Sequence, residues 1–210
     1  MRHSPGKPPA VSERPTRIAV DLDHLAFNLR SIRAHVGVPV MGIVKANAYG
    51  HGLVPVARHL QAQGVEQLGV AFVEEGIALR QAGVTTPVLV LGGIFGRQVA
   101  QFIAHELEIT VSSPDKLRQV EAAAQAMGRK AVIHLKIDTG MERIGVHSYS
   151  SKAFVEAAVA SPWCELKGMY SHLACSDDPN SPMTAQQLER FLEACAHIER
   201  IGAPVPVRHL

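Results

Sequence analysis

A short apolar run followed by a segment of helical periodicity recurs along this chain, and this alternation limits the possible folds more than any other feature. The apolar runs that we expect to be strands are 38–44, 68–73, 87–93, 106–113, 131–138, 164–173 and 206–210. The expected helices between them are 53–64, 74–83, 97–104, 114–127, 152–159 and 184–201. Runs that are apolar throughout are typical of strands buried on both faces. The alternation therefore predicts βα units around a parallel sheet.

The segments between the apolar runs carry local helix signals. Ser113, Pro114 and Asp115 predict a helix start, with serine as the N-cap, proline at the first helical position and an acid in the first turn. We expect that helix to run to about Met127 and to end at Gly128. Such short, glycine-closed connections are typical of a regular βα repeat.

Two α/β architectures fit this repeat, an open doubly wound sheet and a (β/α)₈ TIM-type barrel. The doubly wound nucleotide-binding form usually has a glycine-rich turn after its first strand, and this chain contains neither G-x-G-x-x-G nor G-x-x-x-x-G-K-[ST]. Six or seven units of similar length favour the barrel, whose typical size is ~250 residues. We therefore expect a barrel that is truncated within its seventh βα unit, with a complete open sheet as the alternative.

Composition narrows the class of protein further. The 210 residues are 47% hydrophobic and 19% charged, which is enough to bury a sizeable core. With 21 Lys and Arg against 19 Asp and Glu, the net charge of +2 argues against nucleic-acid binding. The three cysteines are an odd number at wide spacing, which excludes a disulfide scaffold and favours the reducing cytoplasm.

The N-terminal segment has no apolar core of a secretory signal, and no apolar stretch approaches the ~20 residues of a membrane-spanning helix. We expect no association with a membrane. The domain prediction is a disordered, basic and proline-rich tail over residues 1–16, followed by a partial barrel domain over residues 17–210.

In a parallel barrel, the C-terminal ends of the strands face the reaction site. Lys45 closes an apolar run there, and its partly desolvated amine would be available for a Schiff base with an aldehyde. The small residues that follow leave room for a flat ligand, and Tyr49 can place its phenol over the same space. The alternative is that Lys45 extends into solvent, as lysines at strand ends usually do.

A second group of candidates follows the run 131–138. By strand alternation, Lys136 and Asp138 share a face, and the glycines in the following loop allow a tight turn. Arg143 then offers a planar fork that suits a carboxylate. The alternative is a structural ion pair between Lys136 and Asp138, with Arg143 as a solvated loop charge.

Two histidines complete the set of candidates. His172 lies at a predicted strand end, where its imidazole could contact a ring, although a lone histidine there is more often a core residue. His172 and Cys175 lack further ligands at the spacing of a zinc site, so we expect no metal. Arg208 and His209 would point into the same mouth if the seventh unit is real. The residues alone predict a site for a carbonyl compound and a small carboxylate.

Two long motifs resemble signatures of the bacterial alanine racemases. VKANAYGHG (44–52) is similar to the segment around the lysine that binds pyridoxal phosphate, and KIDTGMERIG (136–145) is similar to a second family signature. Weaker similarity covers VDLDHLAFNLRSIR (20–33) and GMYSHLACSDDP (168–179), and the resemblance runs from about residue 18 to residue 210. The resemblance implies an N-terminal eight-stranded barrel that binds pyridoxal 5'-phosphate, a C-terminal β domain and a homodimer.

The resemblance also implies an activity and residue roles. The activity would be the racemisation of L- and D-alanine in the cytoplasm, which supplies D-alanine for peptidoglycan. Lys45 would hold the cofactor covalently and would move the α-proton on one face of the substrate. Tyr49 would contact the cofactor. Arg143 would orient the cofactor's phenolic oxygen and the substrate carboxylate, and Lys136, which the family often carbamylates, would position that arginine.

The two histidines have implied roles as well. His172 would pack against the pyridine ring, and His209 matches the histidine just before an Asn-Ser phosphate-binding pair. That pair, the arginine facing the pyridine nitrogen, the eighth strand and the second acid/base, a tyrosine of the partner's C-terminal domain, fall outside the 210 residues. We therefore expect an N-terminal portion of the enzyme, which alone would retain the cofactor weakly and would not racemise efficiently.

Three other readings remain open at this point. The first is a broad-specificity or serine racemase of the same fold, which would share Lys45 and Arg143. The second is a non-catalytic pyridoxal-phosphate-binding protein, which would not need Arg143. The third is an aldolase that uses Lys45 without any cofactor.

Overall fold

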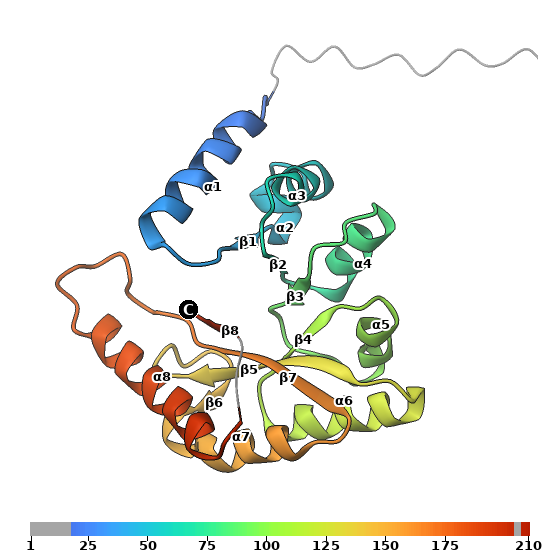
Figure 1. The fold of residues 1–210 in the computed structure, drawn as a ribbon, viewed down its shortest axis with the longest axis vertical. Coiled ribbons are helices and arrows are strands. Elements are labelled where there is room, and N and C mark those ends of the chain that lie inside the picture. Colours follow the sequence, from blue (N-terminus) through green and yellow to red (C-terminus); the bar gives the residue numbers. More distant parts are fainter. Residues whose placement is uncertain (1–17, 204–206) are drawn as a thin grey trace, which may run out of the picture.

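The computed structural model describes residues 18–203 and 207–210, and these form a single eight-stranded, all-parallel sheet (Figure 1). The strand order is β1-β2-β3-β4-β5-β7-β8, and β6 pairs with the end of β5. The strands are β1 (Met41–Ile43), β2 (Gln67–Val70), β3 (Val88–Val90), β4 (Glu108–Val111), β5 (Ala131–Asp138), β6 (Val146–His147), β7 (Cys164–Tyr170) and β8 (Val207–His209). The predicted parallel sheet of βα units is confirmed.

The helices lie on the outside of the arc that the strands make, as Figure 1 shows. They are α1 (Leu22–Val36), α3 (Leu53–Ala62), α4 (Val73–Gln81), α5 (Val99–Ala104), α6 (Pro114–Met127), α7 (Ser151–Ala160) and α8 (Met183–Arg200), with the single turns α2 (Lys45–Tyr49), η1 (Gly96–Gln98) and η2 (Ser148–Ser150). The sheet curves into a half-barrel with β1 and β8 at its edges. This arrangement agrees with the predicted barrel and not with the open doubly wound alternative, which would place helices on both faces.

Local sequence signals explain the best-predicted elements. The Ser113 hydroxyl accepts a hydrogen bond from the Lys116 backbone N–H at 3.2 Å, Pro114 begins α6, and Gly128 ends it with φ +62°. The predicted start and end of this helix are therefore confirmed, as are the bounds of β5. In α1, Asp21 takes the corresponding N-cap role by accepting two backbone N–H groups of the first turn.

Several strands are shorter than the apolar runs that predicted them. The run 38–44 yields only β1, and the run 68–73 ends as a strand at Val70, because α4 already begins at Val73. The run 164–173 likewise ends as β7 at Tyr170. In each case the last residues of the run turn into the loop at the mouth of the barrel. The tail 1–16 and residue 206 of the last expected strand lie outside the described residues.

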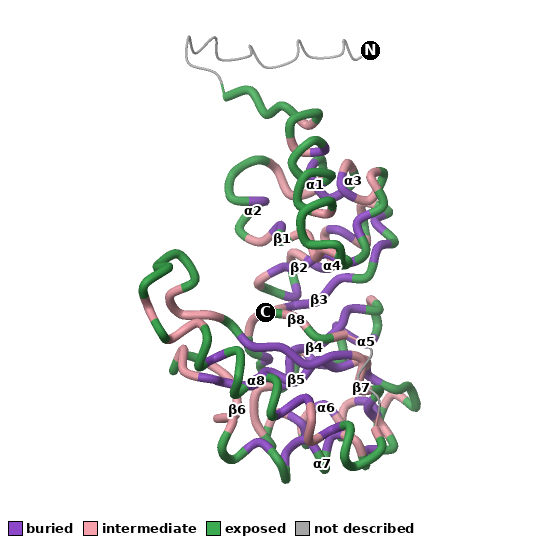
Figure 2. Tube along the Cα trace, turned by 60° about the vertical axis from the view of Figure 1, so that its left-hand side comes forward, coloured by how far each residue is buried: buried purple, intermediate pink, exposed green. Residues whose placement is uncertain are grey.

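The core fills the space inside the arc and the layer between sheet and helices. Figure 2 shows the buried segments following β4 and β5, and α1 largely exposed. The fully buried side chains include Leu68, Ile109, Leu135 and Met169 from the strands, and Leu79, Val120 and Val155 from the helices. Burial of each such side chain stabilises the fold by about 1.5–3 kcal/mol. Across the described residues, no helix is long and apolar enough to cross a membrane.

Candidate active site

One cavity of about 560 Å³ opens at the C-terminal ends of the strands, between the edges β1 and β8. All six of the predicted site residues line it, namely Lys45, Tyr49, Lys136, Arg143, His172 and His209. These residues come from segments that are far apart in the sequence and meet only in the fold. Because this end of a parallel barrel is where active sites are built, the cavity is the candidate active site.

We expected Lys45 to close a strand, but it begins an unusual turn. β1 ends at Ile43. The four consecutive residues 46–49, directly after Lys45, all adopt left-handed backbone angles, with φ between +51° and +56°. Such angles cost about 1–2 kcal/mol per residue for non-glycine residues. The turn places the Lys45 side chain half-buried at the cavity and leaves Tyr49 61% exposed.

Hydrogen bonds from other segments hold this left-handed turn. One carboxylate oxygen of Glu75 accepts from the Ala46 backbone N–H at 2.6 Å, and the other accepts from Ala71 and Phe72 in the loop after β2. The Asn47 side-chain oxygen accepts from the Leu53 N–H at 2.8 Å, at the start of α3. Strain in the backbone is thus balanced by charge-assisted bonds, which are stronger than neutral ones. Sequence analysis missed Glu75, which lies 29 residues from Ala46.

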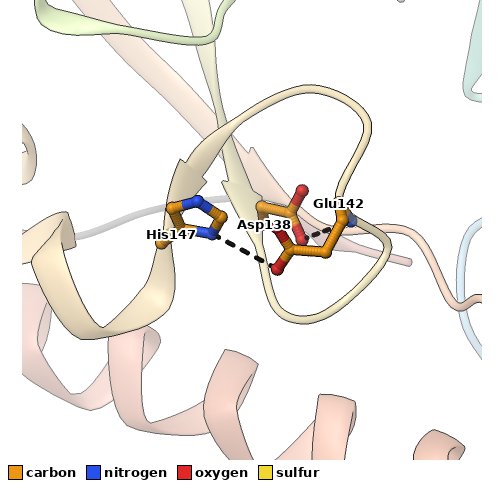
Figure 3. A group of neighbouring side chains, drawn as sticks. All are labelled: Asp138, Glu142 and His147. Carbon is orange, nitrogen blue, oxygen red and sulfur yellow. Dashed lines mark hydrogen bonds and ion pairs between the residues drawn. The ribbon is translucent and has the colours of Figure 1, made fainter.

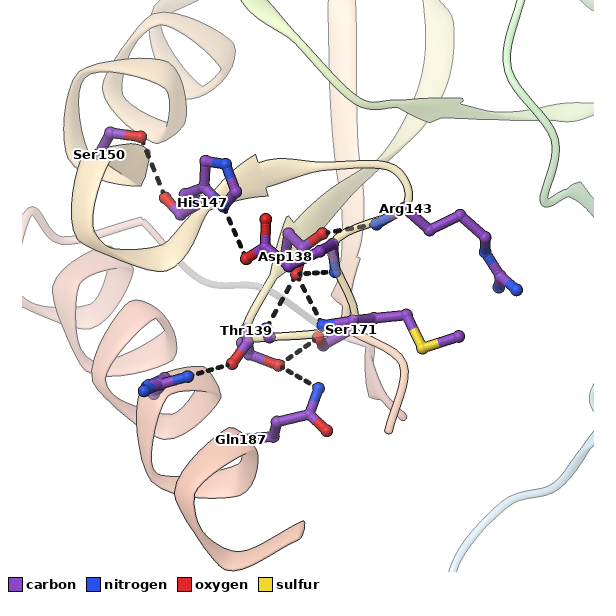
Figure 4. Close-up of polar contacts among 11 residues, drawn as sticks. Asp138, Thr139, Arg143, His147, Ser150, Ser171 and Gln187 are labelled. Carbon is purple, nitrogen blue, oxygen red and sulfur yellow. Dashed lines mark hydrogen bonds and ion pairs between the residues drawn. The ribbon is translucent and has the colours of Figure 1, made fainter. Parts of the chain in front are cut away.

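The loop that carries Arg143 is organised by the carboxylate of Asp138. Figure 4 shows this carboxylate among the backbone N–H groups of residues 140–143, all of which donate to it at 2.8–3.2 Å. Although burial raises the pKa of Asp138, these four donors outweigh it and hold the pKa below 3.8. Gly145 closes the loop with φ +128°, where a Cβ would lie 2.9 Å from backbone atoms of Asp138 and Lys136. The loop therefore requires both Asp138 and Gly145.

Lys136 and Arg143 both reach the cavity, but in different environments. Arg143 is exposed, and its side chain extends away from the loop (Figure 4). Lys136 is 4% exposed, and its Nζ has no hydrogen-bond partner among the described residues. This Nζ lies 4.7 Å from the centre of the Tyr170 ring. Burial lowers the pKa of Lys136 to about 8, even though the charge of Asp138 opposes the shift. The alternative of a Lys136–Asp138 ion pair is wrong, because backbone donors occupy the Asp138 carboxylate.

A buried amide ties the ends of β5 and β7 together beside His172. Gln187 of α8 donates to the His172 carbonyl at 2.9 Å and to the Thr139 hydroxyl at 3.2 Å. That hydroxyl also bonds the Ser171 hydroxyl at 2.7 Å (Figure 4). Partial desolvation lowers the pKa of His172, and the positive charges of Lys136, Arg143 and Lys45 lower it further. Its imidazole is therefore neutral near pH 7. Sequence analysis missed Gln187 because only the fold brings α8 to these strand ends.

At the β8 edge of the sheet, His209 stacks on Tyr170 of the neighbouring strand β7, with ring centres 4.5 Å apart and an angle of 7° between the planes. The Tyr170 hydroxyl bonds Thr110 at 2.8 Å, and burial raises the pKa of Tyr170 to about 12. Tyr170 therefore remains a neutral phenol and supports both His209 and the Lys136 amine. Its signal in the sequence was only its position two residues before His172.

Asp138, Glu142 and His147 form the only group within the described residues whose spacing could suit a metal ion. Figure 3 shows the three side chains around the loop that β6 closes. The Asp138 carboxylate, however, is already filled by four backbone donors, and His147 approaches Glu142 at 3.5 Å. We therefore interpret these three side chains as stabilising the loop, and we propose no metal site here.

Comparison with known proteins places this cavity in a family. The sequence model of the alanine racemase N-terminal domain matches residues 20–210. A relative named alanine racemase 2, from Caldanaerobacter subterraneus, is 39% identical over 200 residues, which cover 94% of this chain and 52% of that protein. An alanine racemase from Beutenbergia cavernae is 40% identical over 93% of this chain and 53% of its own length.

Solved structures agree with the sequence relatives. The alanine racemase of Clostridium difficile in complex with cycloserine superposes with a TM-score of 0.87 at 33% identity, over 90% of this chain and 52% of that one. That of Streptomyces lavendulae gives 0.87 at 38% identity, over 90% and 51%. The chain spans about half the length of these relatives. It belongs to the alanine racemase family, in which it corresponds to the N-terminal domain.

Proposed function

We propose that this chain forms the pyridoxal-phosphate-binding half of an enzyme that interconverts L- and D-alanine. The single observation that carries the proposal is the convergence of both family motifs on one cavity, where Lys45 from the first motif faces Lys136 and Arg143 from the second. Family membership supports the reaction type.

The residues at the cavity suit pyridoxal phosphate. Its volume of about 560 Å³ is within the usual range for a small ligand, about 300–1,000 Å³. Lys45 offers a half-buried primary amine, and the cations Lys45 and Arg143 favour an anionic ligand. The buried amine of Lys136 lacks a partner, which an added group could supply. When bound, pyridoxal phosphate supplies an electron sink that makes the Cα–H bond of the substrate acidic.

Lys45 and Arg143 then divide the work of the reaction. The Lys45 amine would hold the cofactor and, once free, would take or return the α-proton on one face of the substrate. The Arg143 guanidinium would bind the carboxylate through its planar fork. Tyr49, His172 and His209 are proposed to contact the cofactor from the rim of the cavity.

Lys136 is proposed to serve as a support for Arg143. With a pKa near 8, about a tenth of its amine is unprotonated at neutral pH and can react with dissolved CO₂. A bond forms between Nζ and the carbon, and the amine releases one proton, which leaves a carbamate anion. That anion would occupy the buried site next to Arg143 and would replace an unpartnered cation by a partner for the guanidinium.

The proposal extends to a second subunit and to a setting. Tyr49, Phe72 and Phe95 are each at least 61% exposed and follow the C-terminal ends of β1, β2 and β3. Exposed aromatic side chains beside a site are typical of protein interfaces. A second copy covering this rim would exclude water from the cavity. The product D-alanine would serve peptidoglycan synthesis in the cytoplasm.

The test is a racemisation assay on the full-length gene product, in which the turnover of L-alanine, L-serine and L-lysine to the D-enantiomer is measured separately for each amino acid. We expect Lys45→Ala to reduce turnover by at least ~10³-fold and Arg143→Ala to reduce kcat/KM by ~10–100-fold. Lys152→Ala, an exposed lysine on α7, is the matched control and should have no effect.

The alternative functions give different outcomes in this assay and in measurements of cofactor absorbance and aldolase activity. Faster turnover of serine would indicate a serine or broad-specificity racemase. Cofactor binding without racemisation of any amino acid, and without an effect of Arg143→Ala, would indicate a binding protein. A purified protein without the absorbance of pyridoxal phosphate, but with aldolase activity that requires Lys45, would overturn the proposal.

A further inference from the structure

A chain of buried polar side chains crosses the barrel interior from the N-terminal end of the strands to the mouth. Glu108 on β4 is 6% exposed and bonds His134 on β5, with Oε2 and Nε2 2.8 Å apart. The other ring nitrogen of His134, Nδ1, lies 3.2 Å from Nε2 of His209 on β8. At the far end, Lys167 on β7 pairs with the second oxygen of Glu108. His209 lines the candidate active site, so the chain connects that site to a buried carboxylate.

The carboxylate end of this chain is charged and fully satisfied. Burial raises the pKa of Glu108, but the hydrogen bonds from His134 and Lys167 outweigh it and hold the pKa below 4.5. Gln67 adds a further donor to the same carboxylate. An ionised carboxylate can only accept, so His134 must donate from Nε2.

The charge balance then decides the state of His134. Lys167 already neutralises Glu108, and His134 is completely buried. A second proton on its ring would leave an uncompensated positive charge in the interior, which is costly. His134 is therefore a neutral imidazole with its proton on Nε2, and its Nδ1 is an acceptor. Its contact with His209 then requires that His209 donate from Nε2.

We propose that Glu108, acting through His134, fixes His209 in the tautomer protonated on Nε2, so that Nδ1 of His209 offers only a hydrogen-bond acceptor to a ligand. Burial, above all, lowers the pKa of His209 to about 3, so the ring carries no charge at neutral pH. His209 thus selects an N–H or O–H donor and disfavours a phosphate or carboxylate oxygen. Anionic groups at the mouth are left to Lys45 and Arg143.

The backbone around His134 is shaped for this contact. Gly168 on β7 is the strand partner of His134, and a Cβ at that position would lie 2.3 Å from Nδ1 of the His134 ring. Any side chain there would push the ring away from His209. The parallel stacking of His209 on Tyr170 fixes the second ring in the same way. The two imidazoles are therefore positioned as a pair.

Neutron diffraction from deuterium-exchanged crystals of the full-length gene product tests the proposal directly. We expect deuterium on Nε2 of both His134 and His209 and none on either Nδ1. Deuterium on Nδ1 of His209, or on both nitrogens of His134, would overturn it. The consequence for catalysis rests on the proposed function, but the deuterium map does not, so failure of one is distinguishable from failure of the other.

A variant provides a second test. In Glu108→Gln, the Lys167 ammonium can only donate and should hold the amide oxygen, so the amide N–H₂ faces His134 and Gln67, whose own amide can turn its oxygen toward the new donor. Both histidines should then change to the Nδ1-protonated tautomer, which ¹⁵N chemical shifts of the ring nitrogens report. Glu156→Gln is the matched control, because Glu156 bonds His197 in the same way at 3.0 Å but on the surface. Retention of the Nε2 proton on His209 in folded Glu108→Gln protein would contradict the proposal, and failure of that variant to fold leaves the neutron experiment decisive.

Discussion

Two loops at the mouth each present a cation to the cavity, and each is held by a carboxylate that accepts backbone N–H groups. In the loop of Arg143, the carboxylate is internal, since Asp138 binds residues 140–143 of its own loop. In the turn of Lys45, it comes from outside, since Glu75 reaches Ala46 from the next βα unit. The same physical device therefore fixes both cations, but one loop is self-contained and the other depends on its neighbour.

The two loops should therefore respond differently when the supporting carboxylate is removed. The Arg143 loop loses the acceptor of four of its backbone N–H groups when this one carboxylate is removed. The turn of Lys45 keeps the Asn47–Leu53 bond and the buried Ala48 even without Glu75. Asp138 should accordingly be the more sensitive of the two positions.

The largest effect is expected for Asp138→Asn. The amide keeps one acceptor oxygen, but its N–H₂ group faces at least one of the four backbone N–H donors. The free energy of unfolding should therefore fall by about 3 kcal/mol. Urea denaturation at neutral pH measures this loss. Asp115→Asn, an exposed acid in the first turn of α6, is the control and should cost less than about 1 kcal/mol.

The pH dependence sharpens the same prediction. Because the folded pKa of Asp138 lies below 3.8, its contribution is complete above the unfolded pKa and is lost as pH falls through the folded value. The stability difference between the native protein and Asp138→Asn should therefore shrink in strong acid. A difference that does not change with pH would mean that the charge of Asp138 is not what supports the loop.

The next effect in size concerns Lys136, on the strand that leads into the Arg143 loop. Its pKa is about 8 in the folded state and 10.5 in the unfolded chain, so the unfolded state binds more protons between these values and stability rises with pH there. Below pH 8, the buried charge destabilises the fold, and Lys136→Met should raise the free energy of unfolding by about 2 kcal/mol.

Denaturation of the two proteins in CO₂-free buffer at pH 7 and pH 10.5 measures this effect, and CO₂-free conditions keep the amine unmodified. The gain should nearly disappear at the higher pH. Lys152→Met provides the exposed control. An equal gain at both pH values would show that packing, and not the buried charge, explains the difference.

The smallest effect is expected for Glu75→Gln, at about 1–2 kcal/mol, because the amide retains one acceptor and other contacts hold the turn. Hydrogen exchange should rise in residues 46–50 and not in residues 139–145. Glu74→Gln is a close control, since Glu74 is the neighbouring residue and accepts only one surface hydrogen bond, from Gln98. Equal effects of the two substitutions would show that Glu75 does not stabilise the turn.

The contrast between the loops also explains what could be predicted from the sequence. The start and end of α6 were predicted because Ser113, Pro114 and Gly128 act within one turn of their own helix. The loop of Arg143 was partly predictable for the same reason, since Asp138 and Gly145 lie within it. All six site residues reach the cavity because each lies in the C-terminal half of a strand or in the loop that follows it, at the mouth of a parallel barrel.

What could not be predicted depends on partners that are remote in the sequence. The left-handed turn after Lys45 contains no glycine before Gly50 and forms because Glu75 and Leu53 bind it. β6 is only two residues long and exists through its pairing with β5. The contact between His134 and His209 joins residues 75 positions apart. No local pattern carries such information.

The proposed function depends above all on the Lys45 amine as the covalent attachment point for pyridoxal phosphate. Borohydride reduction of the full-length gene product with the cofactor, followed by digestion and mass spectrometry, tests it most directly. We expect a reduced phosphopyridoxyl group on Lys45 and on neither Lys136 nor Lys152. An unmodified Lys45 in a sample that has bound the cofactor, or the label on another lysine, would contradict it.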